Sequence, residues 1–108
     1  MTHAMRPIHP QAVPNDPLAV RWVVRTGTRG VVGEVVAAPD PFGALMRDRV
    51  VALALLETEG IWVWLAPGNT WADCGHKVRE AILESLDLDG WRINGDSADL
   101  LRLVADDV

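Results

Sequence analysis

The residues that most constrain the fold are the five-residue run Ile61-Trp62-Val63-Trp64-Leu65. Successive side chains of a β-strand point to opposite faces, so the three aliphatic residues would share one face and the two tryptophans the other. Both faces of such a strand are apolar, and each must be covered. Other residues must therefore pack on each of the two faces of this strand. They can come from the core of the same chain or from a partner.

A second apolar run lies just before this strand. Val50–Leu56 is followed by the polar connection Glu57–Gly60, an arrangement that is typical of an antiparallel hairpin. Further upstream, Leu18–Arg25 and the Val-rich Val31–Val36 are separated by the turn residues Thr26–Gly30. These two segments predict two more strands of an antiparallel sheet.

The second half of the chain changes from a period of 2 to a period of 3.6. Its apolar residues form one stripe, which predicts a helix over about 70–86: Cys74, Val78, Ala81, Ile82 and Leu86. A short edge strand is expected at Trp91–Ile93. Asp96 is placed to cap a last helix, Ser97–Val104, whose inward side would carry Leu100, Leu101 and Val104.

The order of these elements, strands first and helices after, predicts an α+β fold. We expect an antiparallel β meander or a small barrel over about 18–66, packed by C-terminal helices over about 70–86 and 97–104. Residues 1–17 contain four prolines and predict an extended arm. The chain would then be this arm followed by a single domain over 18–108, and the arm could either fray or dock on another subunit.

One stretch of the front half carries a family resemblance. Arg25–Val35 leads through a Gly-flanked turn into a Val-rich strand, and a hairpin follows that ends in the aromatic strand Trp62–Leu65. In this order of elements the front half, less than half of the chain, resembles the small β-barrels of the Src-homology and KOW type. The resemblance implies an SH3-like binding module for peptides or nucleic acids, and not an enzyme. It assigns no role to an individual residue.

Cysteine usage and hydropathy exclude several classes of protein. The single cysteine excludes an intramolecular disulfide and a metal site built from several cysteines. No run approaches 18 apolar residues, and the N-terminus has no apolar signal segment. We therefore expect a cytoplasmic protein without a membrane span and without a cofactor.

A composition poor in Lys and rich in Arg, Val and Ala suggests a bacterium with GC-rich DNA, or one of its phages.

The net charge of −5 is unevenly distributed along the chain. Residues 1–66 hold six arginines against six acids, whereas residues 67–108 hold four basic residues against nine acids. Nucleic-acid binding requires a basic footprint. A neutral front half and an acidic back half make nucleic acid a possible partner that is not favoured.

Cys74 and His76 form the one catalytic-looking pair. A cysteine in the first turn of a helix has its thiolate stabilised by the helix dipole, and a neighbouring histidine could activate it. However, residues two apart on a helix point to nearly opposite sides, and Cys74 belongs to the apolar stripe. We expect Cys74 to be a core residue; a small thiol-dependent hydrolase or transferase using Cys74 is the alternative.

The segment Ser85–Asp96 resembles a degenerate EF-hand or dockerin loop. Asp87, Asp89, Gly90 and Asp96 would occupy loop positions 3, 5, 6 and 12. Position 1 is a serine, and position 12 lacks the usual bidentate Glu. The same residues also explain a helix end, a turn and a helix cap. Asp87, Asp89 and Asp96 are therefore weak metal candidates, and no bound metal is expected.

The tryptophans of the predicted strands over 18–25 and 61–65 suggest a partner-binding surface, because Trp is enriched in the cores of interfaces. The candidate residues are Trp22, Trp62, Trp64, Arg21 and Arg25. The Trp62 and Trp64 side chains have two candidate covers, the helix over 70–86 or another chain. The resulting hypothesis is a non-enzymatic protein interaction or assembly module that engages a protein partner, or a copy of itself, through the Trp-rich strand and the Pro-rich arm. A nucleic-acid-binding small barrel is a further alternative.

Overall fold

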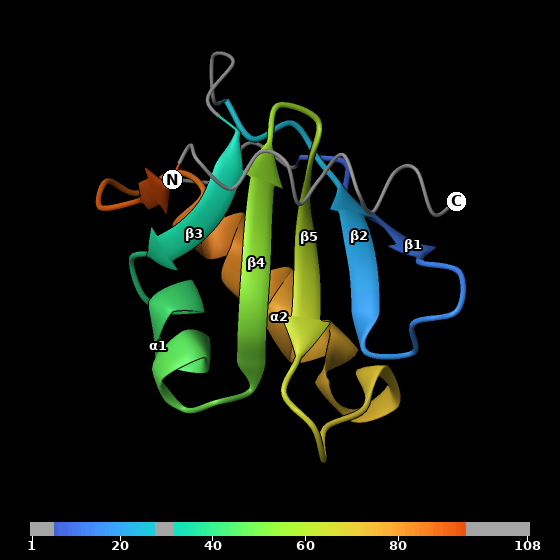
Figure 1. The fold of residues 1–108 in the computed structure, drawn as a ribbon. Helices are drawn as coiled ribbons and strands as arrows, with labels where there is room; N and C mark the ends of the chain where they lie inside the picture. The colour runs from blue at the N-terminus through green and yellow to red at the C-terminus, as the bar shows by residue number, and fades with distance from the viewer. Residues whose placement is uncertain (1–5, 28–31, 95–108) are drawn as a thin grey trace.

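The computed structural model describes residues 6–27 and 32–94. Within them, six strands form one open antiparallel sheet (Figure 1). Across the sheet the strands run β1 (His9–Ala12), β2 (Ala19–Val23), β5 (Gly60–Leu65), β4 (Val51–Glu57), β3 (Gly33–Ala37) and β6 (Arg92–Asn94). The helices are α1 (Phe42–Arg47) and α2 (Trp71–Ser85).

This architecture confirms the predicted α+β fold, with most strands first and the long helix near the end. The sheet is not closed, so the front half is an open sheet and not a barrel. The predicted helix over 70–86 is α2, whereas the one predicted over 97–104 lies outside the described residues. No helix in the described ranges is both long enough and apolar enough to cross a membrane.

The strands β2 and β3 follow each other in sequence but are not neighbours in the sheet. The hairpin of β4 and β5, predicted at residues 50–65, lies between them. Beyond β2 the chain runs on beside the tip of this hairpin: the backbone N–H groups of Val24 and Thr26 donate to the carbonyls of Glu59 and Thr58, at 3.1 Å each. These bonds hold the chain straight where a turn back to β3 was expected.

The predicted N-terminal arm contributes a strand to the domain. Residues 9–12 are extended, as the prolines of residues 1–17 imply, but they form β1 and pair with β2 of the same sheet. Ile8 is buried in the core. The domain therefore begins well before residue 18, and an arm outside it can include only residues that precede Ile8. Pro10 lies in this edge strand, where a missing N–H is tolerated.

The aliphatic face of β5 is covered by α2. Ile61, Val63 and Leu65 are at most 1% exposed, and they belong to one cluster with the helix stripe Cys74, Val78, Ala81 and Ile82. Thr70 begins the helix, where its hydroxyl accepts a hydrogen bond from the Asp73 N–H at 3.2 Å. Each buried Ile, Val or Leu contributes about 1.5–3 kcal/mol, so this side is the main core of the domain.

Ser85 joins the two helices at the end of α2. Its buried hydroxyl accepts a hydrogen bond from the backbone N–H of Phe42 at 3.0 Å. The Trp91 indole donates to the Ser85 carbonyl at 2.9 Å, and its ring stacks on Phe42 with 5.6 Å between centroids. These contacts fix α1 and the chain leading to β6 on the α2 side of the sheet.

Candidate functional site

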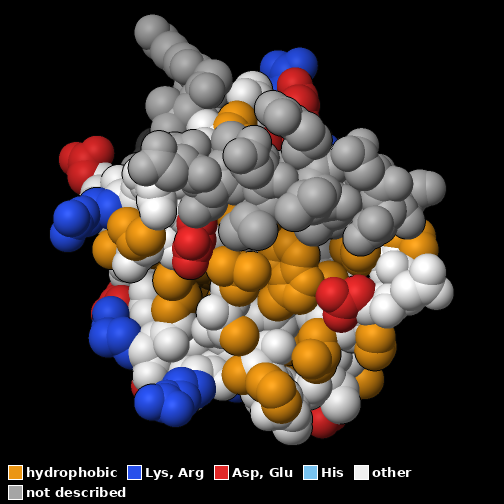
Figure 2. Space-filling model, in the orientation of Figure 1, with side chains coloured by type: hydrophobic (Ala, Val, Ile, Leu, Met, Phe, Trp, Pro, Cys, Tyr) orange, Lys and Arg blue, Asp and Glu red, His pale blue; other side chains and the backbone are white. Residues whose placement is uncertain are grey.

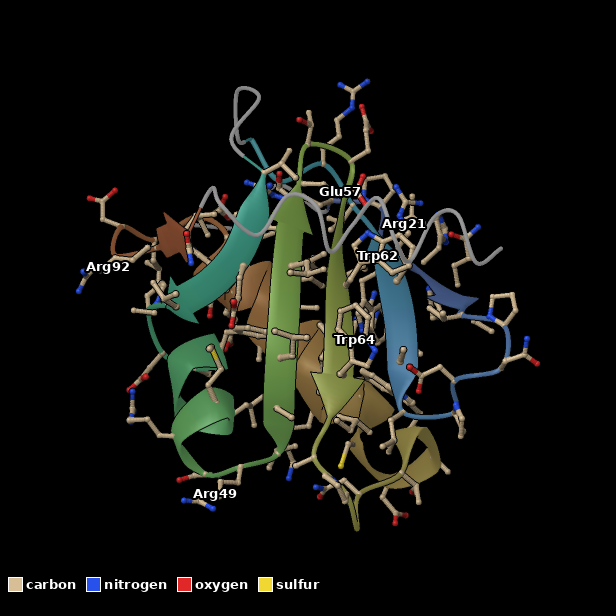
Figure 3. All side chains as sticks on the ribbon, viewed as in Figure 1. Arg21, Arg49, Glu57, Trp62, Trp64 and Arg92 are labelled. Atoms are coloured by element: carbon tan, nitrogen blue, oxygen red, sulfur yellow. The ribbon has the colours of Figure 1, made fainter. Side chains whose placement is uncertain are left out.

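Trp62 and Trp64 lie on the face of the sheet opposite α2 (Figure 3). The register places Arg21 and Leu55 on either side of Trp62 and places Ala19 and Leu53 beside Trp64. We call this surface the Trp face; its residues are Ala19, Arg21, Leu53, Leu55, Glu57, Trp62 and Trp64. Of the two covers considered for the tryptophans, α2 is excluded, because it packs on the aliphatic face. No helix of the described residues lies over the Trp face (Figure 1).

The centre of the Trp face is apolar. Figure 2 shows hydrophobic side chains gathered over β4 and β5, with acidic side chains at the margins of the group. Leu55 is 0% exposed and Ala19 is 3% exposed, whereas Leu53 and both tryptophans are partly exposed. Leu55 and Ala19 do not belong to the core cluster that includes α2. The sheet therefore has a second apolar centre on this face.

A polar cluster borders this apolar centre at the top of the sheet (Figure 3). Arg21 donates to Glu57 with two nitrogens, Nε to Oε2 at 2.9 Å and Nη2 to Oε1 at 3.0 Å. The Trp62 indole N–H donates to the same carboxylate, and the Arg21 guanidinium lies 5.6 Å from the Trp62 ring centroid. Such bidentate, charge-assisted hydrogen bonds fix the positions of all three side chains.

The electrostatics of this cluster favour its charged form. Burial raises the pKa of Glu57, but hydrogen bonds from Arg21 and Trp62, together with the charge of Arg21, lower it below the ordinary value of 4.5. The hydrogen bond to Glu57 raises the pKa of Arg21, which burial alone would lower. Both groups are therefore ionised near neutral pH, and their charges compensate each other on the Trp face.

Trp64 is fixed by a second carboxylate. Its indole N–H donates to Asp16 at 2.9 Å, from the connection between β1 and β2. Its ring stacks on that of Trp62, with 6.3 Å between centroids and 17° between planes. Because both indole N–H groups are bonded within the domain, the rings keep one orientation and present their apolar surfaces. Preorganised aromatic side chains lose little conformational entropy when they bind.

Trp22, predicted as a partner-binding residue, lies on the other face of the sheet. It is 4% exposed and packs edge-on against Trp71, with 5.9 Å between ring centroids. Its indole N–H has no hydrogen-bond partner among the described residues. Trp22 therefore belongs to the core and cannot contact a partner, because alternation along β2 turns it away from Arg21.

Arg25, the other predicted partner residue, is exposed beyond the end of β2. It lines a shallow hollow of about 560 Å³ together with Arg6, Pro7, His9, Val23, Val24 and Glu59. Arg6 donates to the Arg25 carbonyl at 2.5 Å. Arg25 thus lines this hollow, and Arg21 and Trp62 are not among the described residues that line it.

Cys74 and His76 do not come together. Cys74 is 6% exposed within the core cluster, and its Sγ contacts the Asn69 side-chain oxygen at 3.9 Å. His76 is exposed on the outer side of α2. A buried thiol without a neighbouring base cannot act as a nucleophile on a substrate.

The predicted metal ligands are also apart where the structure describes them. Asp87 forms an ion pair with Arg6, and Asp89 is exposed. Asp96 lies outside the described residues. Across residues 6–27 and 32–94, no group of three or more His, Cys, Asp or Glu side chains is close enough to hold a metal ion.

Glu57 and Asp16 are the site residues that sequence reasoning missed. The sequence pattern predicts Glu57 as part of a turn, yet it lies two residues after Leu55 in β4 and therefore shares the face of Leu55. A strict period of 2, continued to the end of the predicted strand, would have placed its carboxylate near Trp62. No comparable sequence pattern points to Asp16. It lies in the connection between β1 and β2, so its position depends on β1, which the sequence pattern does not predict as a strand.

Comparisons of the chain with protein-family models, with curated proteins and with solved structures found no match. The function therefore has to be argued from the Trp face itself.

Proposed function

We propose that this chain is a non-enzymatic assembly module that binds a second copy of itself through the Trp face. The observation that carries the proposal is the uneven covering of the sheet: α2 lies on one side, and no described helix lies on the other, where Leu53, Trp62 and Trp64 are partly exposed. Interface cores are enriched in Trp and depleted in unpaired charge, as is this surface.

Charge compensation supports a partner of the same kind. The chain has a net charge of −5, which opposes self-association in general. On the Trp face, however, Arg21 and Glu57 neutralise each other in a bidentate pair. This pairing lowers the cost of bringing two Trp faces together, because neither Arg21 nor Glu57 would be buried as an unpaired charge.

The test is solution mass as a function of concentration, for the native chain and two variants. The native mass should rise from 11.8 kDa towards twice that value. Trp64→Ala should move the midpoint at least about tenfold to higher concentration, as expected for an interface hot spot. Leu88→Ala is the matched control, because Leu88 is 47% exposed just after α2, and it should leave the midpoint unchanged. A native chain that stays monomeric throughout would contradict the proposal.

The proposal does not depend on the N-terminal arm. Residues 9–12 pair within their own sheet, so deleting 1–17 would remove a strand and the buried Ile8 as well. A deletion limited to 1–5 is the proper test of the arm, and we expect it to leave the self-association midpoint unchanged.

Nucleic-acid binding is the weaker alternative, because the arginines are scattered over the molecule. Figure 3 shows Arg21, Arg49 and Arg92 in three separate places, and Arg21 is already bonded to Glu57. Affinity that falls steeply with added salt would favour this alternative.

A free, buried Cys74 is compatible with the reducing cytoplasm that we propose as the compartment.

A further inference from the structure

The side chains of the Trp face lie in two rows that cross the sheet. The first row follows the register through four strands, from β2 through β5 and β4 to β3: Arg21, Trp62, Leu55 and Glu34. The second row crosses three of these strands: Ala19, Trp64 and Leu53. In both rows the tryptophan belongs to β5 and the leucine beside it to β4. The first row therefore has a cation at one end and a carboxylate at the other.

A surface of this kind is complementary to a second copy of itself in one orientation. A two-fold axis parallel to the strands, midway between β4 and β5, would place β5 of each copy over β4 of the other, and β2 over β3. This midline has three of the described strands on either side, so the two sheets overlap fully. Arg21 then faces Glu34 of the second copy, and Trp64 faces its Leu53. Each of these contacts occurs twice, because both copies use the same surface.

The other aligned arrangement has its two-fold axis across the strands. Sheets that pack face to face keep their strands within about 30° of each other, so these two arrangements are the ones to compare. An axis across the strands brings each strand over its own copy. Rings would then oppose rings and leucines would oppose leucines, which fills the interface unevenly. The two β3 strands would bring their Glu34 carboxylates towards each other, and opposed like charges are costly. Volume and charge both favour the axis parallel to the strands.

Arg21 can reach a second carboxylate without leaving the first. Its bonds to Glu57 and Gln11 use three of its five N–H groups. The side chains of Arg21 and Glu57 are each 21% exposed, and Glu34 is also partly exposed. A carboxylate from a second copy on the remaining N–H groups would extend the charge-assisted cluster across the interface.

We propose that two copies of the chain pair with β5 over β4 and β2 over β3, so that Arg21 of each copy bonds Glu34 of the other and Trp64 packs on Leu53. This orientation rests on the proposed self-association and adds to it the position of the partner. It makes Glu34 a specificity-determining residue of the interface, because Glu34 selects a partner that presents an arginine where this chain presents Arg21.

The first test removes the charge of Glu34. Glu34→Gln keeps the length of the side chain and should move the midpoint of self-association about threefold or more to higher concentration, because the lost contact occurs twice. Glu84→Gln is the matched control, since Glu84 is exposed on α2 and its loss changes the net charge equally. It should leave the midpoint nearly unchanged. A midpoint in Glu34→Gln that equals or falls below that of Glu84→Gln would overturn the orientation.

The second test locates the partner directly. Chains with a nitroxide on Arg92→Cys, in a Cys74→Ala background, are mixed with isotope-labelled chains without a nitroxide, so that NMR reports only broadening between copies. Gln11 and Ala12 on β1 should broaden, because β6 of one copy lies over β1 of the other. Broadening confined to β3 and β6 would overturn the orientation and leave the self-association standing. Broadening over the outer side of α2 would overturn the Trp face as the interface. A mass that stays at 11.8 kDa in these samples would overturn the proposed function, and the orientation with it.

Discussion

The two faces of the sheet are built from alternate residues of the same strands, and yet their side chains are held in place by different interactions. On the α2 face, aliphatic side chains from β4, β5 and the helix fill a common core. On the Trp face, aromatic rings are held by carboxylates from neighbouring segments, with Glu57 bonded to Trp62 and Asp16 bonded to Trp64. The α2 face requires side chains whose volumes together fill the core without voids. The Trp face requires that each indole N–H meets a hydrogen-bond acceptor.

This difference teaches where the stability of the domain and its specificity reside. Buried aliphatic groups stabilise the fold wherever they fit, but they do not fix a surface for a partner. The indole N–H groups on the Trp face already donate to carboxylates of the same chain. A partner can therefore bury the rings without breaking a hydrogen bond. The α2 face should therefore dominate the free energy of unfolding, and the Trp face should dominate binding.

The largest effect should come from opening a cavity on the α2 face. Ile61→Ala should lower the free energy of unfolding by about 3 kcal/mol, because Ile61 is 0% exposed beneath α2. Leu53→Ala on the partly exposed Trp face should cost about 1 kcal/mol. Urea unfolding of both variants measures the difference. Equal losses would show that both faces are cores of the same kind.

A smaller loss should follow from Ser85→Ala. The substitution leaves the buried N–H of Phe42 without its acceptor and should cost about 1–3 kcal/mol. Ser85→Thr, which keeps a hydroxyl, is the comparison that separates the hydrogen bond from packing. Thermal unfolding of the two variants measures it, and a neutral Ser85→Ala would mean that this bond does not hold α1 in place.

Removing the charge of Glu57 should have a still smaller effect on stability, about 1–2 kcal/mol, because the group is partly exposed and Arg21 can reach water. Asp40→Asn is the control: its ion pair with Arg47 is 61–64% exposed, and its loss should cost about 0.5 kcal/mol or less. Glu57→Gln should in addition change the Trp62 indole N–H signal, which Asp40→Asn should leave unchanged. Equal losses of stability in the two variants would show that the polar cluster of the Trp face stabilises the fold no more than an exposed ion pair does.

The smallest effect concerns pH. The pKa of Glu57 is lower in the folded chain than its ordinary value of 4.5, so the folded state binds the proton less tightly than the unfolded state. Its stabilising contribution is complete above about pH 4.5 and is lost as the pH falls through the folded pKa. Unfolding free energies measured between pH 3 and 7 should therefore fall less steeply towards acid in Glu57→Gln than in the native chain. Parallel curves would contradict the assignment.

The sequence predicted those elements whose pattern is complete within one segment. The hairpin over 50–65 and the helix over 70–86 were found because their periods of 2 and 3.6 are carried by their own residues. The strand β1 was missed because Pro10 and its polar neighbours have no apolar alternation. Its pairing with β2 is a long-range contact that no local pattern encodes.

The candidate site was predicted only in part, for a related reason. Trp62 and Trp64 stand out by residue type and by spacing, but the sequence alone does not show that α2 packs on the opposite face of the sheet. The residue type of Trp22 also suggests a partner surface, but the alternation along β2 places its side chain in the core. Glu57 and Asp16 act through bonds to residues that lie 5 and 48 positions away in sequence, and such pairs cannot be read before the register is known.

The short strands at both edges of the sheet limit what an assembly of this chain can become. β1 has four residues and includes Pro10, and β6 has three residues, so neither edge offers a long row of free backbone groups to an incoming strand. An open sheet with an apolar face would otherwise be at risk of growing strand by strand into a fibre. If the chain associates through the Trp face as proposed, its short edge strands would favour pairing face to face over pairing edge to edge. A face that meets its own copy would then form a closed, two-fold pair of chains.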